Sequence, residues 1–127
     1  MSQAPAQAMT LLHLYADDNG DTHFGTTEFM LTRQDFAPPA TPFHTSDAQS
    51  ATRFVMIQLP PGWVGEPHVS PKKLVLFCLS GSVKVTCSTG EAEVLTAGMG
   101  MAMSDVAGKG HKSEVISAEP VNAVIIQ

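Results

Sequence analysis

The sequence predicts an all-β domain, built as a sandwich or a barrel. Short segments rich in β-branched, aromatic and other apolar residues follow one another along the chain, and turns rich in Gly, Pro, Asn and Asp separate them. No segment shows the apolar periodicity of an amphipathic helix of ordinary length. With 127 residues, 43% of them apolar and 15% charged, the chain is suited to burying the core of one domain.

The first half of the chain has the sparser strand signals. Residues 1–9 are mostly small or polar, so we expect a flexible tail ahead of a single domain over residues 10–127. The apolar segment 10–15 and the Thr- and Phe-rich segment 22–31 are expected strands, joined by a turn of Asp, Asn and Gly. Three prolines in residues 35–50 indicate an extended loop or arm.

Strand signals are dense in the second half. The expected strands there are residues 52–59, 74–79, 82–88, 91–98, 99–104, 111–118 and 121–127. The run from Leu74 to Leu79 is almost continuously apolar, which is typical of a strand covered on both faces.

Charge and apolar distribution exclude several classes of partner. The net charge is −5 and the chain has no basic run, so we expect no binding to nucleic acid or to anionic membranes. No apolar stretch has the length of a membrane span, and the N-terminus lacks the pattern of a secretory signal. A cytoplasmic protein is therefore expected, in which Cys78 and Cys87 are buried thiols rather than a disulfide.

One segment combines glycine and histidine at a characteristic spacing. Five residues separate Gly62 from His68, and Ser70 follows two positions later. Three further residues lead to Leu74, and six more lead to Gly81.

A second segment has a spacing of its own. Five residues separate Gly100 from Val106, Gly108 follows two positions later, and two residues lead on to His111. Three residues then precede Val115. The glycine of the LTAG sequence, two positions before Gly100, is an alternative start that lengthens the intervening loop by two residues.

These two spacings resemble the two motifs of the cupins, which are double-stranded β-helix barrels of the jelly-roll kind. The resemblance covers residues 62–115, and the proline and asparagine of the family's second motif are both valines here. In metal-bearing cupins, two histidines and a glutamate of the first motif and one histidine of the second bind the metal. At those four positions this chain has His68, Ser70, Leu74 and His111.

The resemblance therefore implies an incomplete metal site. A serine hydroxyl is a poor ligand and a leucine is none, so we expect no cofactor. The alternative is a weakly bound divalent metal (Fe, Zn, Mn or Ni) held by His68 and His111, with Glu66 or His44 as a third ligand.

The same pocket has a possible chemistry without metal. Imidazole titrates near neutral pH, so His68 and His111 are a candidate acid/base pair, and we expect them to face each other across a mostly apolar cavity. The candidate ligand-binding residues are Ser70, Leu74, Leu76, Met56 and Trp63.

Three functions stay open at this point. The first is a metal-independent acid/base enzyme of the isomerase, dehydratase or cyclase type, as found among cupins without metals. The second is a metal-dependent oxygenase or lyase with a reduced ligand set, and the third is a non-catalytic small-molecule-binding or sensor protein. A homodimer is expected in each case, because an N-terminal strand and a proline-rich arm can cover the strand edge of a neighbouring copy.

Overall fold

The structure is a computed structural model and describes residues 7–127. These residues form eleven β-strands joined by turns and loops, without a helix. The strands are β1 (Gln7–Ala16), β2 (Thr22–Gln34), β3 (Phe43–Thr45), β4 (Phe54–Leu59), β5 (Val64–His68), β6 (Leu74–Ser80), β7 (Val83–Cys87), β8 (Ala92–Leu95), β9 (Gly100–Met103), β10 (His111–Val115) and β11 (Val121–Ile126). Over the described residues, nothing in the structure is a helix that could cross a bilayer.

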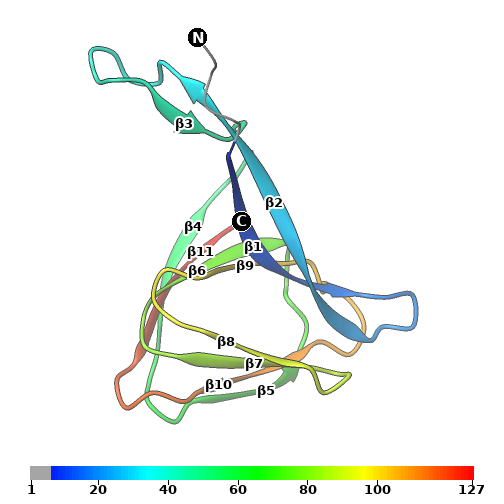
Figure 1. The fold of residues 1–127 in the computed structure, drawn as a ribbon. Helices are drawn as coiled ribbons and strands as arrows, with labels where there is room; N and C mark the ends of the chain where they lie inside the picture. Colours follow the sequence, from blue (N-terminus) through cyan, green and yellow to red (C-terminus); the bar gives the residue numbers. More distant parts are fainter. Residues whose placement is uncertain (1–6) are drawn as a thin grey trace.

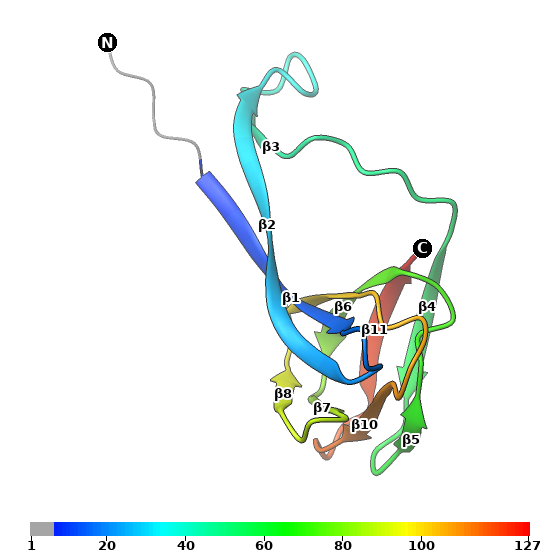
Figure 2. The same cartoon turned by 90° about the vertical axis from the view of Figure 1, so that its right-hand side faces the viewer.

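Two sheets face each other and enclose the interior of a barrel (Figure 1 and Figure 2). The large sheet has the strand order β3-β2-β1-β9-β6-β11-β4, and the small sheet has the order β5-β10-β7-β8. In the large sheet β4 pairs with β11, the last strand of the chain. In the small sheet the next strand, β5, pairs with β10. This nesting of strand pairs is the double-stranded β-helix, so the predicted all-β jelly-roll fold is confirmed.

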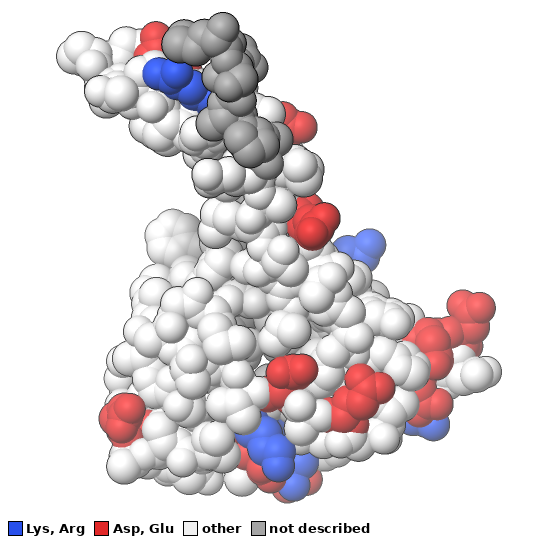
Figure 3. Space-filling model, in the orientation of Figure 1, with Lys and Arg blue, Asp and Glu red and all other residues white. Residues whose placement is uncertain are grey.

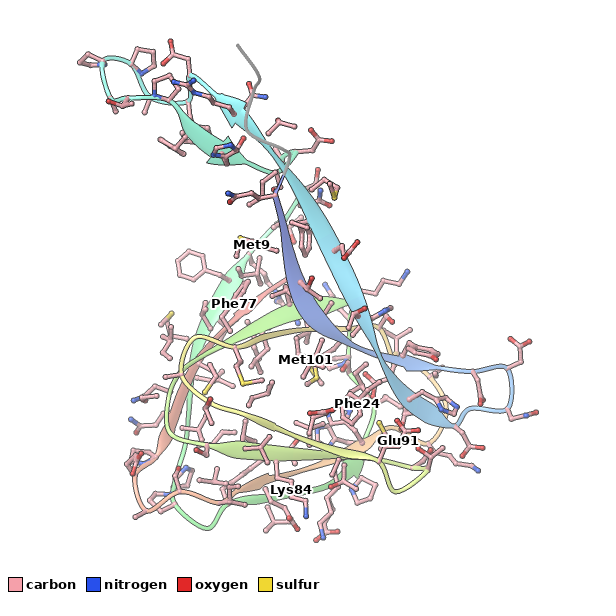
Figure 4. The ribbon with its side chains drawn as sticks, in the orientation of Figure 1. Met9, Phe24, Phe77, Lys84, Glu91 and Met101 are labelled. Atoms are coloured by element: carbon pink, nitrogen blue, oxygen red, sulfur yellow. The ribbon has the colours of Figure 1, made fainter. Side chains whose placement is uncertain are left out.

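Alternation along the strands determines what the barrel encloses. In β6, Leu74 and Cys78 are buried in the core, while Phe77 lines a groove on the opposite side of the large sheet. Figure 4 shows Met101 of β9 between the two sheets. The buried apolar core consists of Leu14, Leu74, Cys78, Val83, Val85, Cys87, Leu95, Met101, Met103, Val115, Val121 and Ala123. Complete burial of a leucine such as Leu95 contributes roughly 2 kcal/mol to stability.

The two cysteines are free thiols inside this core, as predicted. Burial in apolar surroundings raises the pKa of the thiols of both Cys78 and Cys87. They therefore contribute to packing rather than to thiolate chemistry.

The N-terminal strands extend the large sheet and leave the barrel as an arm. β1 begins at Gln7, so residues 7–9 of the expected tail are part of a strand; residues 1–6 lie outside the described part of the chain. β1 pairs antiparallel with β2 and parallel with β9. We define the arm as residues 7–9 together with residues 29–45; it projects beyond the barrel, and the chain returns from it to β4 at the opposite edge of the sheet (Figure 2).

The large sheet is apolar on the side that faces away from the barrel interior. A groove of about 700 Å³ lies there, between the arm and strands β6 and β9. Its apolar lining comes from Met9, Leu11, Phe29, Leu31, Leu74, Val75, Phe77, Ala51, Ala102, Met103 and Ile126. Among the described residues that line it, Lys73 is the charged one. Figure 3 shows charged atoms on the lower part of the barrel, at the β1–β2 turn and on the arm. We call the apolar side of the large sheet that carries this groove the outer face.

A cluster of charged side chains fastens the β1–β2 turn to the barrel. His23 Nε2 lies 2.8 Å from Asp17 Oδ2, and its Nδ1 lies 3.8 Å from Glu91 Oε1. Lys109 Nζ lies 2.8 Å from Asp21 Oδ1. The hydrogen bond between Asp17 and His23 raises the pKa of the imidazole and lowers that of the carboxyl group.

The first prediction concerns this cluster. Because the folded-state pKa of His23 is raised above 6.5, its pairing stabilises the protein fully below pH 6.5 and is lost as the pH rises through the raised value. The Asp17 contribution is present above pH 3.8 and is lost as the pH falls through the lowered value. The melting temperature of His23→Gln should thus fall below that of the wild type at pH 5 to 6, by about 1 to 3 °C, and the difference should shrink as the pH rises through the raised pKa of His23.

Asp17→Asn, which removes the partner carboxylate, is the matched control. In a protein that already carries Asp17→Asn, the further change His23→Gln should lower the melting temperature less at pH 5 to 6 than it does in the wild type. A melting-temperature difference that stays constant across the pH range would contradict a role for the ion pair.

Candidate functional site

The two motif histidines lie side by side at one end of the barrel interior. His68 ends β5 and His111 begins β10, and the two residues are register partners in the small sheet. Their ring centroids are 4.6 Å apart, with the ring planes inclined by 56°. The sequence suggested that the two rings face each other across the pocket; the strand pairing instead makes them neighbours on one wall. His111 is 3% exposed, whereas His68 is exposed to solvent.

A buried carboxylate holds the ring of His111. Asp105 is fully buried, and its Oδ2 lies 2.6 Å from His111 Nδ1. Its Oδ1 accepts a hydrogen bond of 2.8 Å from Ser70 Oγ, and its backbone carbonyl accepts another of 3.0 Å from the Ser70 N–H. All three side chains are shielded from water, so the chain Ser70–Asp105–His111 has one fixed arrangement.

A backbone carbonyl orients the second ring. His68 Nδ1 lies 2.7 Å from the carbonyl oxygen of Glu66. Because a carbonyl oxygen only accepts, Nδ1 of His68 carries the hydrogen and Nε2 has a free lone pair.

The backbone beside the histidines requires a glycine. Gly110 directly precedes His111 and has a φ of +73°, in the left-handed region that glycine adopts without strain. A Cβ at Gly110 would overlap the carbonyl oxygen of His68. Thr22, which is fully buried, donates a 2.9 Å hydrogen bond to the Gly110 carbonyl and so ties the β1–β2 turn to the same point.

The histidines open into a cavity of about 160 Å³ in the barrel interior. Most of its walls are aliphatic or aromatic. The lining residues are Ile57, Leu59, Trp63, His68, Ser70, Pro71, Leu74, Leu76, Val83, Val85, Leu95, Met101, Met103, His111, Ser113, Val121, Ala123 and Ile125. A β-bulge between His111 and Ser113 interrupts the pairing with β5 at this point.

Four of the five expected ligand-binding residues line this cavity: Ser70, Leu74, Leu76 and Trp63. The fifth, Met56, does not, because its side chain is 60% exposed and Ile57 and Leu59 are the β4 residues that line the cavity. Ser70 lines the wall, but its hydroxyl hydrogen is committed to Asp105, so it is unavailable as a donor to a ligand.

The donor set does not fit the four-ligand metal site of the family. Ser70 and Leu74 occupy two of the four positions. Glu66 contributes its backbone carbonyl to His68, and His44 lies on β3, paired with Arg33 in the arm. Within residues 7–127, no group of three His, Cys, Asp or Glu side chains is arranged to hold a metal ion.

Asp105 is the functional residue that sequence reasoning missed. The available signal was an acidic residue inside the second motif, six positions before His111. Spacing alone does not show that the loop folds back and brings this carboxylate onto the ring, because the contact depends on the turn at Gly108 and Gly110.

The second prediction tests the buried carboxylate. Asp105→Ala leaves Ser70 and His111 without their acceptor and should lower the free energy of unfolding by about 3 kcal/mol. Ser70→Ala removes one donor and should cost about 1 kcal/mol. Urea denaturation measures both, and an Asp105→Ala loss no larger than that of Ser70→Ala would show that the carboxylate is not the centre of the network.

Comparisons with known proteins give distant likenesses. No protein-family model and no curated protein sequence matches this chain. A Cupin 2 conserved barrel domain protein from Salinispora arenicola is 16% identical over 78% of this chain and 76% of its own, with a TM-score of 0.45. The cupin domain of Cnp3 from Schizosaccharomyces pombe is 9% identical over 98% of this chain and 86% of its own, with a TM-score of 0.47.

A third solved structure, AerE from Microcystis aeruginosa, is 16% identical over 98% of this chain and 78% of its own, with a TM-score of 0.47. The fold is established by the chain's own strand order. His68 of the first motif lies on β5, Leu74 of the same motif lies on β6, and His111 of the second motif lies on β10; all three line one cavity. The chain thus has the fold of a cupin barrel.

Proposed function

We propose that this protein binds a small molecule inside its barrel and moves a proton on it without a resident metal, as an isomerase, dehydratase or cyclase does. The observation that carries the proposal is the buried Asp105–His111 pair beside His68, at the polar end of an otherwise apolar cavity. Paired groups of this kind, in a cleft largely shielded from water, are the usual apparatus of acid/base catalysis.

The proposed step follows from the hydrogen bonds. Asp105 accepts the Nδ1 hydrogen of His111, so Nε2 is the basic atom. Nε2 removes a proton from a carbon next to a carbonyl group, and the electron pair moves onto the carbonyl oxygen. Asp105 stabilises the imidazolium that forms, and the imidazolium returns the proton to the substrate. Ser113, which lines the cavity, offers a hydroxyl to the developing oxyanion.

The third prediction tests the proton transfer. In D₂O, the wild type should speed up the exchange of hydrogen for deuterium at the C–H next to the carbonyl of 3-hydroxybutanone, which ¹H NMR measures. In His111→Gln the protein-dependent exchange rate should be at least about 100-fold lower. Leu76→Trp, which fills the cavity while keeping both histidines, should also lose it.

Equal exchange with and without the wild-type protein would favour the non-catalytic binding function instead. A metal-dependent oxygenase or lyase is the other alternative; stoichiometric Fe, Zn, Mn or Ni in the dialysed native protein, lost in His68→Ala, would favour it.

We propose further that two copies pair through the outer face. The support is the composition of this face: apolar side chains of the arm and of β6, β9 and β11 line one groove. The chain carries a net charge of −5, yet among the described residues that line the groove there is no carboxylate and Lys73 is the charged one. Two copies can meet there without repulsion between carboxylates. The arm, which contributes to the lining of the groove, also carries the exposed apolar side chains Met30, Phe36 and Phe43. In a symmetric dimer, the arm of each copy could therefore contact the groove of the other.

The fourth prediction tests this pairing by light scattering after gel filtration. The wild type should elute as a dimer, and Phe77→Glu should be a monomer, because a buried unpaired carboxylate opposes association. Val94→Glu places the same charge on an exposed position of β8, in the small sheet, and should remain a dimer. A monomeric wild type, or a dimer that survives Phe77→Glu, would contradict the proposed interface.

A further inference from the structure

The hydrogen bonds around the two histidines also determine which chemical class the pocket accepts. His68 Nδ1 donates to the carbonyl of Glu66, and His111 Nδ1 donates to the carboxylate of Asp105. Asp105 receives the Ser70 hydroxyl hydrogen on its other oxygen, so the carboxylate acts as an acceptor on both sides. In its neutral form, each ring is therefore held as the Nδ1–H tautomer and leaves the lone pair of Nε2 for a ligand.

Apart from the two histidines, the described walls of the cavity carry no cationic side chain that would attract an anion. Of the described residues that line it, none is Lys, Arg, Asn or Gln. The hydroxyl of Ser70 is used by Asp105, which leaves the Ser113 hydroxyl and the Trp63 indole N–H as side-chain donors among the described residues that line the cavity. A carboxylate in this cavity would face two nitrogen lone pairs and apolar walls, at a large cost in desolvation.

The size of the cavity limits the ligand. About 160 Å³ accommodates roughly five groups the size of a water molecule, each needing about 30 Å³. The cavity lies beside His68, whose side chain is exposed, so one end of a slightly larger molecule can extend toward solvent.

We propose that the pocket selects small, mainly apolar molecules that carry a hydroxyl or phenol group, whose hydrogen is donated to Nε2 of His68 or His111. This inference rests on the proposed function, since it assigns the ligand class of the same cavity. Molecules of equal size without a donor leave both lone pairs unpaired, and carboxylates bring a third acceptor to a site that already has two.

The experiment compares probes of matched shape. Phenol and fluorobenzene differ in one donor at nearly constant size, and benzyl alcohol and benzoate contrast a donor with an anion. Titrations followed by ¹⁵N-resolved NMR at about pH 8, well above the pKa of a free imidazole, give the dissociation constants. Phenol should bind at least about tenfold more tightly than fluorobenzene, and benzyl alcohol at least about tenfold more tightly than benzoate.

The tautomers are read in the same samples. The ¹⁵N shifts of both side chains should show a protonated Nδ1 and an unprotonated Nε2, and Nε2 of at least one ring should shift when phenol binds. His68→Phe keeps an aromatic ring and removes one acceptor, so it should reduce the preference for phenol over fluorobenzene. Asp105→Asn tests the positioning role: it should loosen the His111 tautomer and change the ¹⁵N pattern even where the amide spectrum shows a native fold.

The possible outcomes separate this inference from the proposed function. Equal affinity for phenol and fluorobenzene, tighter binding of benzoate than of benzyl alcohol, or Nε2–H tautomers would overturn the donor preference. A donor preference without any exchange of 3-hydroxybutanone would leave the ligand class standing and remove the acid/base reaction. If none of the four probes binds to protein whose amide spectrum is native, the ligand class is wrong.

Discussion

The buried carboxylate of Asp105 joins two loops that are far apart in the sequence, and the pocket depends on it. Asp105 receives hydrogen bonds from Ser70, 35 residues away, and from His111 on β10. Removing a charge from water costs several kcal/mol unless hydrogen-bond donors replace the lost hydration. The buried carboxylate therefore requires both donors, and the positions of Ser70 and His111 are fixed by their bonds to it. The ring of His111 consequently has a defined tautomer and orientation before any ligand arrives.

This arrangement gives a physical meaning to the departures from the cupin metal motif. Ser70 occupies a position where metal-bearing cupins have a histidine ligand, and here its hydroxyl donates to Asp105. Leu74, at the position of the glutamate ligand, is part of the cavity wall. The two substitutions therefore do more than remove ligands: one supports the buried carboxylate, and the other makes the cavity more apolar. What remains is a pair of oriented imidazoles that line a small, mainly apolar cavity.

Sequence patterns could predict most of the fold and of the cavity wall. Alternation places Met56 and Phe54 on one side of β4, but it does not show which side faces inward, because both sides of this edge strand carry apolar residues. Ile57 is inside the barrel, and Met56 is exposed. Asp105 was missed for a related reason: a loop residue has no periodicity from which its direction can be read.

The sequence by itself determined the all-β class, since strand and turn signals depend on local backbone geometry and on strand alternation. The jelly-roll architecture was implied by the resemblance of its two glycine- and histidine-bearing motifs to those of the cupins. It also showed that Ser70 and Leu74 stand at two of the four positions where metal-bearing cupins have ligands, because ligand identity depends on residue type. Only the tertiary structure decided that His68 and His111 are neighbours on one wall, that Asp105 and Ser70 complete the network, and which face of each strand encloses the cavity. These features depend on strand register and loop closure, which bring together residues that no local pattern connects.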